Sequence, residues 1–192
     1  MLNAMFKRDP VTSTTYYPAK TNWDDLRFPI SGLKVPSVAT APGIDLDDGM
    51  ALFETGKTTL VTGFAQIPHD WWEGRPMKPH VHFECMTDQP GNISMQLDYK
   101  IADIKGLYPE IWDTFSVVIP ANLTPNLHDI FGSGSLPLTG YHLSAGIKFR
   151  IWRQGTFAVG PFADTYLGDW KLLEYDLHYE RDKIGSGQEY SI

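Results

Sequence analysis

His69, His80 and His82 are three of the six histidines of the chain, and all three fall within residues 68–84. Imidazole titrates near neutral pH and is the commonest protein ligand of transition metals. On a β-strand, the i, i+2 spacing of His80 and His82 places both side chains on one face, with Glu84 next in the same row. The apolar residues between them then point to the other side. This row predicts either a set of metal ligands or a polar surface for another subunit.

The metal interpretation rests on a resemblance to the cupins. Gly74, five intervening residues, His80, one residue and His82 resemble the first half of the cupin metal motif, except that Glu84 comes sooner than the cupin glutamate. A Gly, Pro, Gly, His order that ends at His142 resembles the second half with altered spacing. Together, His80, His82, Glu84 and His142 would suit zinc, iron or manganese in a metal-dependent enzyme. Because both spacings depart from the motif, we expect no catalytic residue, no cofactor and no metal.

The favoured interpretation is a polar sheet face that contacts another subunit. The adjacency of Trp71 and Trp72 to a proline and a glycine favours a packed loop anchor over stacking on sugar rings, and both are also placed among the interface residues. A carboxylate beside imidazoles favours their protonated forms, so the contact is expected to respond to pH between about 5 and 8. The candidate interface residues are His69, Trp71, Trp72, His80, His82 and Trp23.

The elements that must position these residues are strands. Apolar and polar residues alternate through residues 92–101, 142–153 and 170–180. This period of two is typical of half-buried antiparallel strands. The residues expected in the core include Leu143, Ile147, Phe149, Leu173, Tyr175 and Leu177.

Shorter segments complete the expected strands and connections. Strands are predicted at residues 60–66, 80–86 and 114–120, whereas only residues 126–131 and 106–112 suggest a helical turn. Glycine and proline, with 17 and 14 residues, suit a chain with many turns. The sequence therefore predicts an all-β protein with an antiparallel, jelly-roll-like β-sandwich.

Residues 1–50 lack a sustained period, and we expect them to form an extended, irregular N-terminal arm and lead-in. The first 30 or so residues are expected to be ordered mainly by contacts with other chains. The sandwich domain is assigned to residues 51–192. Within the lead-in, Asp45, Asp47, Asp48 and Gly49 resemble a calcium loop but lack its full spacing and distal glutamate, which favours a simple acidic turn.

Composition excludes several classes of function. The net charge is −7, and no block of lysine and arginine interleaves with aromatic residues, so no nucleic-acid partner is expected. No apolar run is long enough for a membrane span, and residues 1–10 lack the apolar segment of a signal peptide. The single cysteine, Cys85, excludes an intrachain disulfide and is expected to be a small buried side chain.

Three blocks of the sequence resemble a family of tailed-bacteriophage proteins. Residues 68–83 are similar to its pattern Pro-His-x-Trp-x-Glu-Gly, a short gap, and Pro-His-x-His-aromatic. Residues 21–29 resemble the N-terminal signature of the family, and segments between residues 173 and 190 resemble its C-terminal one. The family often has tryptophan where Phe83 stands and a basic residue where Trp72 stands.

This resemblance implies a virion structural protein with no catalytic role. It predicts a trimeric capsid decoration (cement) protein, or a neck or tail component that stabilises the particle. The implied partners are further copies of the chain in a homotrimer and other virion proteins, such as the major capsid, neck or tail proteins. The expected location is the virion, after assembly in the host cytoplasm. The alternative is the cupin-like metal-dependent enzyme.

Overall fold

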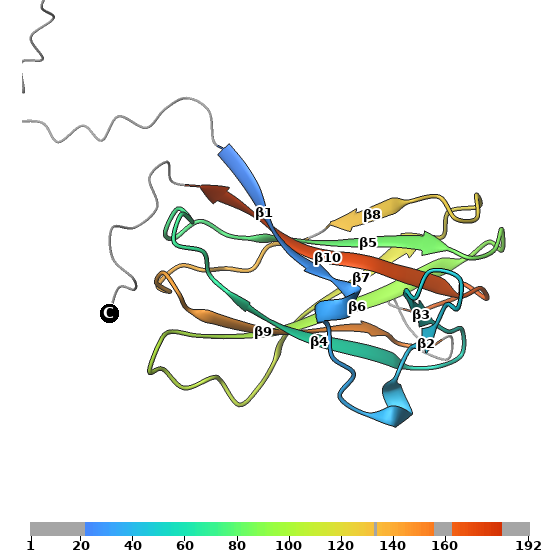
Figure 1. The fold of residues 1–192 in the computed structure, drawn as a ribbon, viewed down its shortest axis with the longest axis horizontal. Helices are drawn as coiled ribbons and strands as arrows, with labels where there is room; N and C mark the ends of the chain where they lie inside the picture. The colour runs from blue at the N-terminus through green and yellow to red at the C-terminus, as the bar shows by residue number, and fades with distance from the viewer. Residues whose placement is uncertain (1–21, 133, 156–162, 182–192) are drawn as a thin grey trace, which may run out of the picture.

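The computed structural model describes residues 22–132, 134–155 and 163–181, which form two antiparallel sheets packed face to face (Figure 1). Sheet A contains β1 (Asn22–Pro29), β2 (Gly43–Ile44), β3 (Ala51–Phe53), β5 (Lys78–Cys85), β8 (Asp129–Gly132) and β10 (Trp170–Arg181). Sheet B contains β4 (Thr59–Gln66), β6 (Asn92–Ala102), β7 (Asp113–Pro120) and β9 (Gly146–Arg153). Two short 3₁₀ helices are η1 (Ile30–Gly32) and η2 (Val38–Thr40). The predicted all-β sandwich is confirmed.

The strands pair in a nested order. β3 pairs with β10, β4 with β9, β5 with β8, and β6 with β7. The resulting sheet orders are β2-β3-β10-β5-β8 and β4-β9-β6-β7, and β1 adds to β10 beyond the end of β3. Nested antiparallel pairing of eight strands across two sheets is what a jelly roll requires.

Sheet A extends into the segment that the sequence assigned to the arm. β1 pairs with β10 along its full length, and Leu26 and Phe28 pack against the core. The domain boundary near residue 50 is therefore wrong, and residues 22–29 are ordered by their own chain. The alternation was hidden because Asp24, an inward-facing residue of this half-exposed edge strand, interrupts the apolar set. Residues 1–21 lie outside the described part of the chain.

The predicted core is confirmed except at Leu173. A β-bulge between Leu172 and Glu174 shifts the pairing of β10 with β5. Before the bulge the even-numbered residues point inward, and after it the odd-numbered residues do, so Leu173 is only half-buried. The other five predicted residues are buried, namely Leu143, Ile147, Phe149, Tyr175 and Leu177.

The predicted helical turns are wrong. Residues 129–132 form β8, and residues 106–112 lie in the connection between β6 and β7 without a helix. The three shorter predicted strands are confirmed as β4, β5 and β7. Among the residues described, no helix is long and apolar enough to cross a membrane.

A buried ion pair fastens the segment that leads into β10. Arg153, the last residue of β9, and Asp164 are both 0% exposed, and the guanidinium donates to both carboxylate oxygens over 3.0 and 3.1 Å. The remaining guanidinium hydrogens reach the backbone carbonyls of Phe53, Tyr166 and Gly168. Every donor of Arg153 is therefore used, which is the condition for a stable buried charge.

Candidate functional site

The outer face of sheet A gathers polar side chains from three neighbouring strands. β5 points His80 and His82 outward while its alternate residues are buried, as the i, i+2 spacing predicts. β10 and β1 lie beside it and add residues to the same face. We define the histidine face as Trp23, Asp25, His80, His82, His128, Asp176 and His178.

Asp176 is the centre of the histidine face. Its Oδ2 lies 2.8 Å from Nε2 of His82, and its Oδ1 lies 3.2 Å from Nδ1 of His80. The Asp176 side chain is only 6% exposed. Burial raises the pKa of the Asp176 carboxyl above its ordinary value, while the hydrogen bond from His82 and the charge of His80 oppose the shift. The face is thus built on a shielded carboxylate shared by two imidazoles.

His82 extends this contact to a third imidazole. Its Nδ1 lies 2.9 Å from Nε2 of His128, which precedes β8, and the two rings are stacked with centroids 5.1 Å apart. A neutral imidazole has one donor and one acceptor nitrogen. If Nε2 of His82 donates to the ionised Asp176, its Nδ1 must accept a hydrogen bond from His128. Asp176, His82 and His128 therefore form one hydrogen-bonded chain.

A second branch runs from His80 towards the end of β1. The rings of His80 and His178 are 5.3 Å apart, and Nδ1 of His178 is hydrogen-bonded to Asp25. Trp23 stacks on His178 with ring centroids 4.7 Å apart. The branch ends in a surface aromatic, because Trp23 is 38% exposed.

Gly132 on β8 makes room for one of these imidazoles. It lies directly opposite His80 in the ladder, and a Cβ at this position would stand 2.4 Å from Cδ2 of the His80 ring. Any larger residue would displace the ring. A glycine at this position therefore leaves room for the His80 ring beside Asp176.

The structure separates the residues of the alternative metal site. Glu84 pairs with Lys171, and Nδ1 of His142 lies 3.2 Å from Oδ2 of Asp103, which follows β6 of the other sheet. Only His80 and His82 remain together. Within residues 22–132, 134–155 and 163–181, no three histidine, cysteine or acidic residues are arranged to hold a metal ion. The cupin-like set is therefore wrong, because His142 lies beside Asp103 of the other sheet and Glu84 pairs with Lys171.

Among the predicted interface residues, Trp71 is wrong. It is 1% exposed, and its indole N–H donates to the carbonyl of Arg75 over 3.0 Å, so it anchors the β4–β5 loop from inside. His69 lies in the same loop with its Nε2 2.7 Å from Oγ of Ser144. Trp72 is half-buried, and its backbone N–H donates to the carbonyl of Glu180 near the end of β10.

His80, His82 and Trp23 are the predicted residues that share the histidine face. Asp25, Asp176 and His178 were missed, although Asp176 and His178 repeat the i, i+2 spacing of the row on β5. Two polar rows of equal period on neighbouring strands are the signal that identifies them. His128 carries no such signal, because it lies outside any strand.

We expect Asp176→Asn to remove a loss of folding stability that the wild type undergoes as the pH rises. Because the folded state raises the pKa of this carboxyl, the folded protein binds more protons than the unfolded chain does. The free energy of unfolding of the wild type therefore falls as pH rises from about 3.9, the ordinary aspartate pKa, through the raised value. The variant should match the wild type near pH 3 and exceed it at neutral pH.

Urea unfolding across this pH range measures the difference between the two proteins. Asp47→Asn, in an exposed turn, is the matched control and should follow the wild type. A constant offset between Asp176→Asn and the wild type at every pH would contradict the expected linkage.

No family model and no curated protein matches the chain. Among solved structures, an isomalto-dextranase of Arthrobacter globiformis T6 complexed with panose is 16% identical at a TM-score of 0.42, over 80% of this chain and 23% of that one. A chain in the structure of infectious bursal disease virus, Gx strain, is 13% identical at a TM-score of 0.39, over 94% of this chain and 38% of that one. The enzymatically active domain of tailspike protein 4 of bacteriophage CBA120 is 13% identical at a TM-score of 0.36, over 81% of this chain and 19% of that one. The chain spans less than half of each of these three chains, and likenesses at these TM-scores carry no argument about function.

Proposed function

We propose that this protein is a structural component of a bacteriophage particle and that the histidine face is its contact with another subunit. One observation carries the proposal. The three sequence blocks that resemble phage virion proteins correspond to β1, to the β4–β5 loop with β5, and to β10. These three strands lie side by side in sheet A (Figure 1). Blocks that are far apart in the sequence thus build one continuous surface.

The chemistry of this surface suits a protein partner. Trp23 and Ile130 are 38% and 53% exposed, and Ile130 on β8 lies directly opposite His82. Aromatic and apolar side chains set among charged groups are typical of a protein interface. The imidazoles are held on strands by hydrogen bonds to Asp176 and Asp25, so little side-chain freedom remains to be lost on association.

Within this proposal the protein assembles as a homotrimer and decorates the capsid, or forms part of the neck or tail. A closed ring of subunits repeats one polar patch around an axis, so a single face serves every contact. The protein then resides in the virion after assembly in the host cytoplasm. Mass spectrometry of purified virions tests the location. A copy number in the hundreds indicates the capsid surface, and a few to about a dozen copies indicates the neck or tail.

We expect His80→Ala with His82→Ala to weaken assembly and to leave the fold intact. Both changes are made in an Asp176→Asn background, because alanines alone would leave a buried carboxylate without its partners. Loss of these imidazoles should raise the dissociation constant of the oligomer roughly tenfold or more. Sedimentation at about pH 5 and pH 8 measures this effect and its pH dependence.

Two proteins serve as controls for this experiment. Asp176→Asn alone shows the effect of the background, and His142→Ala removes an imidazole that pairs with Asp103 outside the face. Unchanged assembly of the triple variant at both pH values would remove the interface role from the histidine face. Loss of the circular-dichroism signal of the strands would show instead that the residues stabilise the fold.

A further inference from the structure

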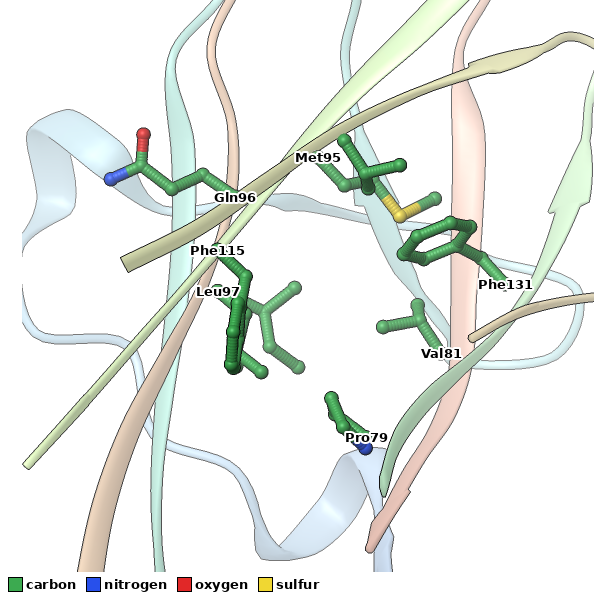
Figure 2. A pocket seen from close by; sticks show the side chains of 9 residues that line it. Pro79, Val81, Met95, Gln96, Leu97, Phe115 and Phe131 are labelled. Carbon is green, nitrogen blue, oxygen red and sulfur yellow. The ribbon is translucent and has the colours of Figure 1, made fainter. Parts of the chain in front are cut away.

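The sandwich is open along one side. β7 ends sheet B and β8 ends sheet A, and a narrow apolar groove with a volume of about 20 Å³ lies between the sheets beside these two edge strands. Figure 2 shows Phe115, Phe131, Val81 and Pro79 around an open space, whereas Gln96 points away from it. Among the described residues, no further strand pairs with the outer edge of β7.

β7 has the properties of an incompletely covered edge strand. Phe115, Val117 and Ile119 face the core, because each lies opposite a buried residue of β6. All three are nevertheless only half-buried. An edge of eight residues also presents backbone N–H and C=O groups on which another strand can add. The groove and the edge together are suited to binding one extended segment with apolar side chains.

We propose that residues 11–17 of a second copy of this chain add to β7 as a further strand and close the groove. These residues read Val-Thr-Ser-Thr-Thr-Tyr-Tyr and lie between Pro10 and Pro18. β-branched and aromatic residues bounded by prolines are typical of a strand. Seven residues also match the eight of β7. They lie outside the described part of the chain, and the inference does not depend on the proposed function.

Charge complementarity supports this occupant. Residues 1–21 contain three basic residues and one acidic residue, which gives a formal charge of +2. Because the whole chain carries −7, the remaining residues carry −9. Arg8 precedes the segment and Lys20 follows it. β7 begins at Asp113, and just beyond its end Asn122 is hydrogen-bonded to Asp129. Asp9 also precedes the segment, but residues 1–21 are net basic, whereas each end of the edge carries an acidic residue.

The position of β1 favours a second copy over the same chain. β1 and β8 lie on opposite sides of sheet A, three strand spacings or about 14 Å apart, and β7 lies in the other sheet, about 10 Å away. The straight line from β1 to β7 is therefore about 17 Å, and a route around the sandwich is longer. The five steps from residue 17 to residue 22 span at most about 18 Å. The straight line runs through the core, and the route around it, about 14 Å across sheet A and about 10 Å to the other sheet, exceeds this span. The segment of the same chain therefore does not reach along β7.

Thiol cross-linking between two full-length variants tests the proposal. Thr14→Cys chains carrying a mass tag are mixed with Ser116→Cys chains and treated with a short bis-maleimide, and the one natural cysteine, Cys85, is buried. We expect a tagged–untagged dimer in several-fold excess over a control mixture with Val38→Cys, which is 93% exposed and belongs to η2. No excess over the control would overturn the proposal. A chain that carries both Thr14→Cys and Ser116→Cys and yields only internally cross-linked monomer would also overturn the proposal.

A proline substitution gives an independent measurement. In the first partner the cysteine is moved from Thr14 to Thr12, and Thr14→Pro is added in the middle of the segment. Because proline cannot join a strand ladder, this change should lower the yield of the cross-link to Ser116→Cys several-fold. Asn3→Pro, outside the segment, should leave the yield unchanged. Equal yields from the two proline variants would contradict strand addition. The histidine-face variant should cross-link like the wild type, which separates this contact from the proposed function.

Discussion

Replacing Arg153 with methionine should lower the free energy of unfolding by about 3–5 kcal/mol, the cost of leaving a buried charge without its partner. Asp164 would remain 0% exposed with no counter-charge. The carbonyls of Phe53, Tyr166 and Gly168 would lose their donors at the same time. Since domains of this kind are stable by about 5–15 kcal/mol, this loss is a large fraction of the total stability.

Urea unfolding compares this variant with a matched surface pair. Arg27→Met removes the partner of Glu174, but the Arg27 side chain is 68% exposed, so solvent screens the pair and the expected loss is far smaller. If Arg153→Met does not fold, Arg153→Met with Asp164→Leu gives the measurement. This double variant buries no charge and should recover part of the stability. Equal midpoints for Arg153→Met and the wild type would contradict the role of the ion pair.

The sandwich was predictable because its strands carry a local signal. Ile93, Met95 and Leu97 alternate with more polar residues, and the buried face follows directly from that period. Leu173 was misplaced because the bulge adds one residue to β10 beside another leucine, Leu172. Two adjacent leucines give no sign of which one points inward. β8 was missed because four residues are too few to show a period.

The histidine face was predictable only one strand at a time. The row on β5 follows from spacing, but His82 and Asp176 are 94 residues apart in the sequence. Their meeting depends on the register of β5 against β10, which the nested pairing of the whole sandwich determines. Trp71 was misassigned for a related reason. No periodic pattern in a loop distinguishes a tryptophan that anchors it from inside, such as Trp71, from its half-buried neighbour Trp72.

The second large effect is expected at Lys171, which neutralises the acidic turn before β3. Its ammonium lies 2.8 Å from Asp48 and 3.4 Å from both Asp45 and Glu84, and its side chain is 8% exposed. The hydrogen bond to Asp48 raises the pKa of Lys171 above its ordinary value despite an opposing effect of burial. Lys171→Met would leave three carboxylates facing one another. The expected loss in the free energy of unfolding is about 1.5–3 kcal/mol, the value of a hydrogen bond to a charged group.

Salt distinguishes this electrostatic role from a loss of packing. Without the ammonium, the carboxylates of Asp45, Asp48 and Glu84 repel one another, and dissolved salt screens such repulsion. A higher salt concentration should therefore raise the urea midpoint of Lys171→Met relative to that of the wild type. Lys57→Met is the control, because Lys57 pairs with Glu54 at the surface and its side chain is 40% exposed. A variant that is destabilised but does not respond to salt would show that the aliphatic stem of Lys171, and not its charge, holds the acidic turn against β10.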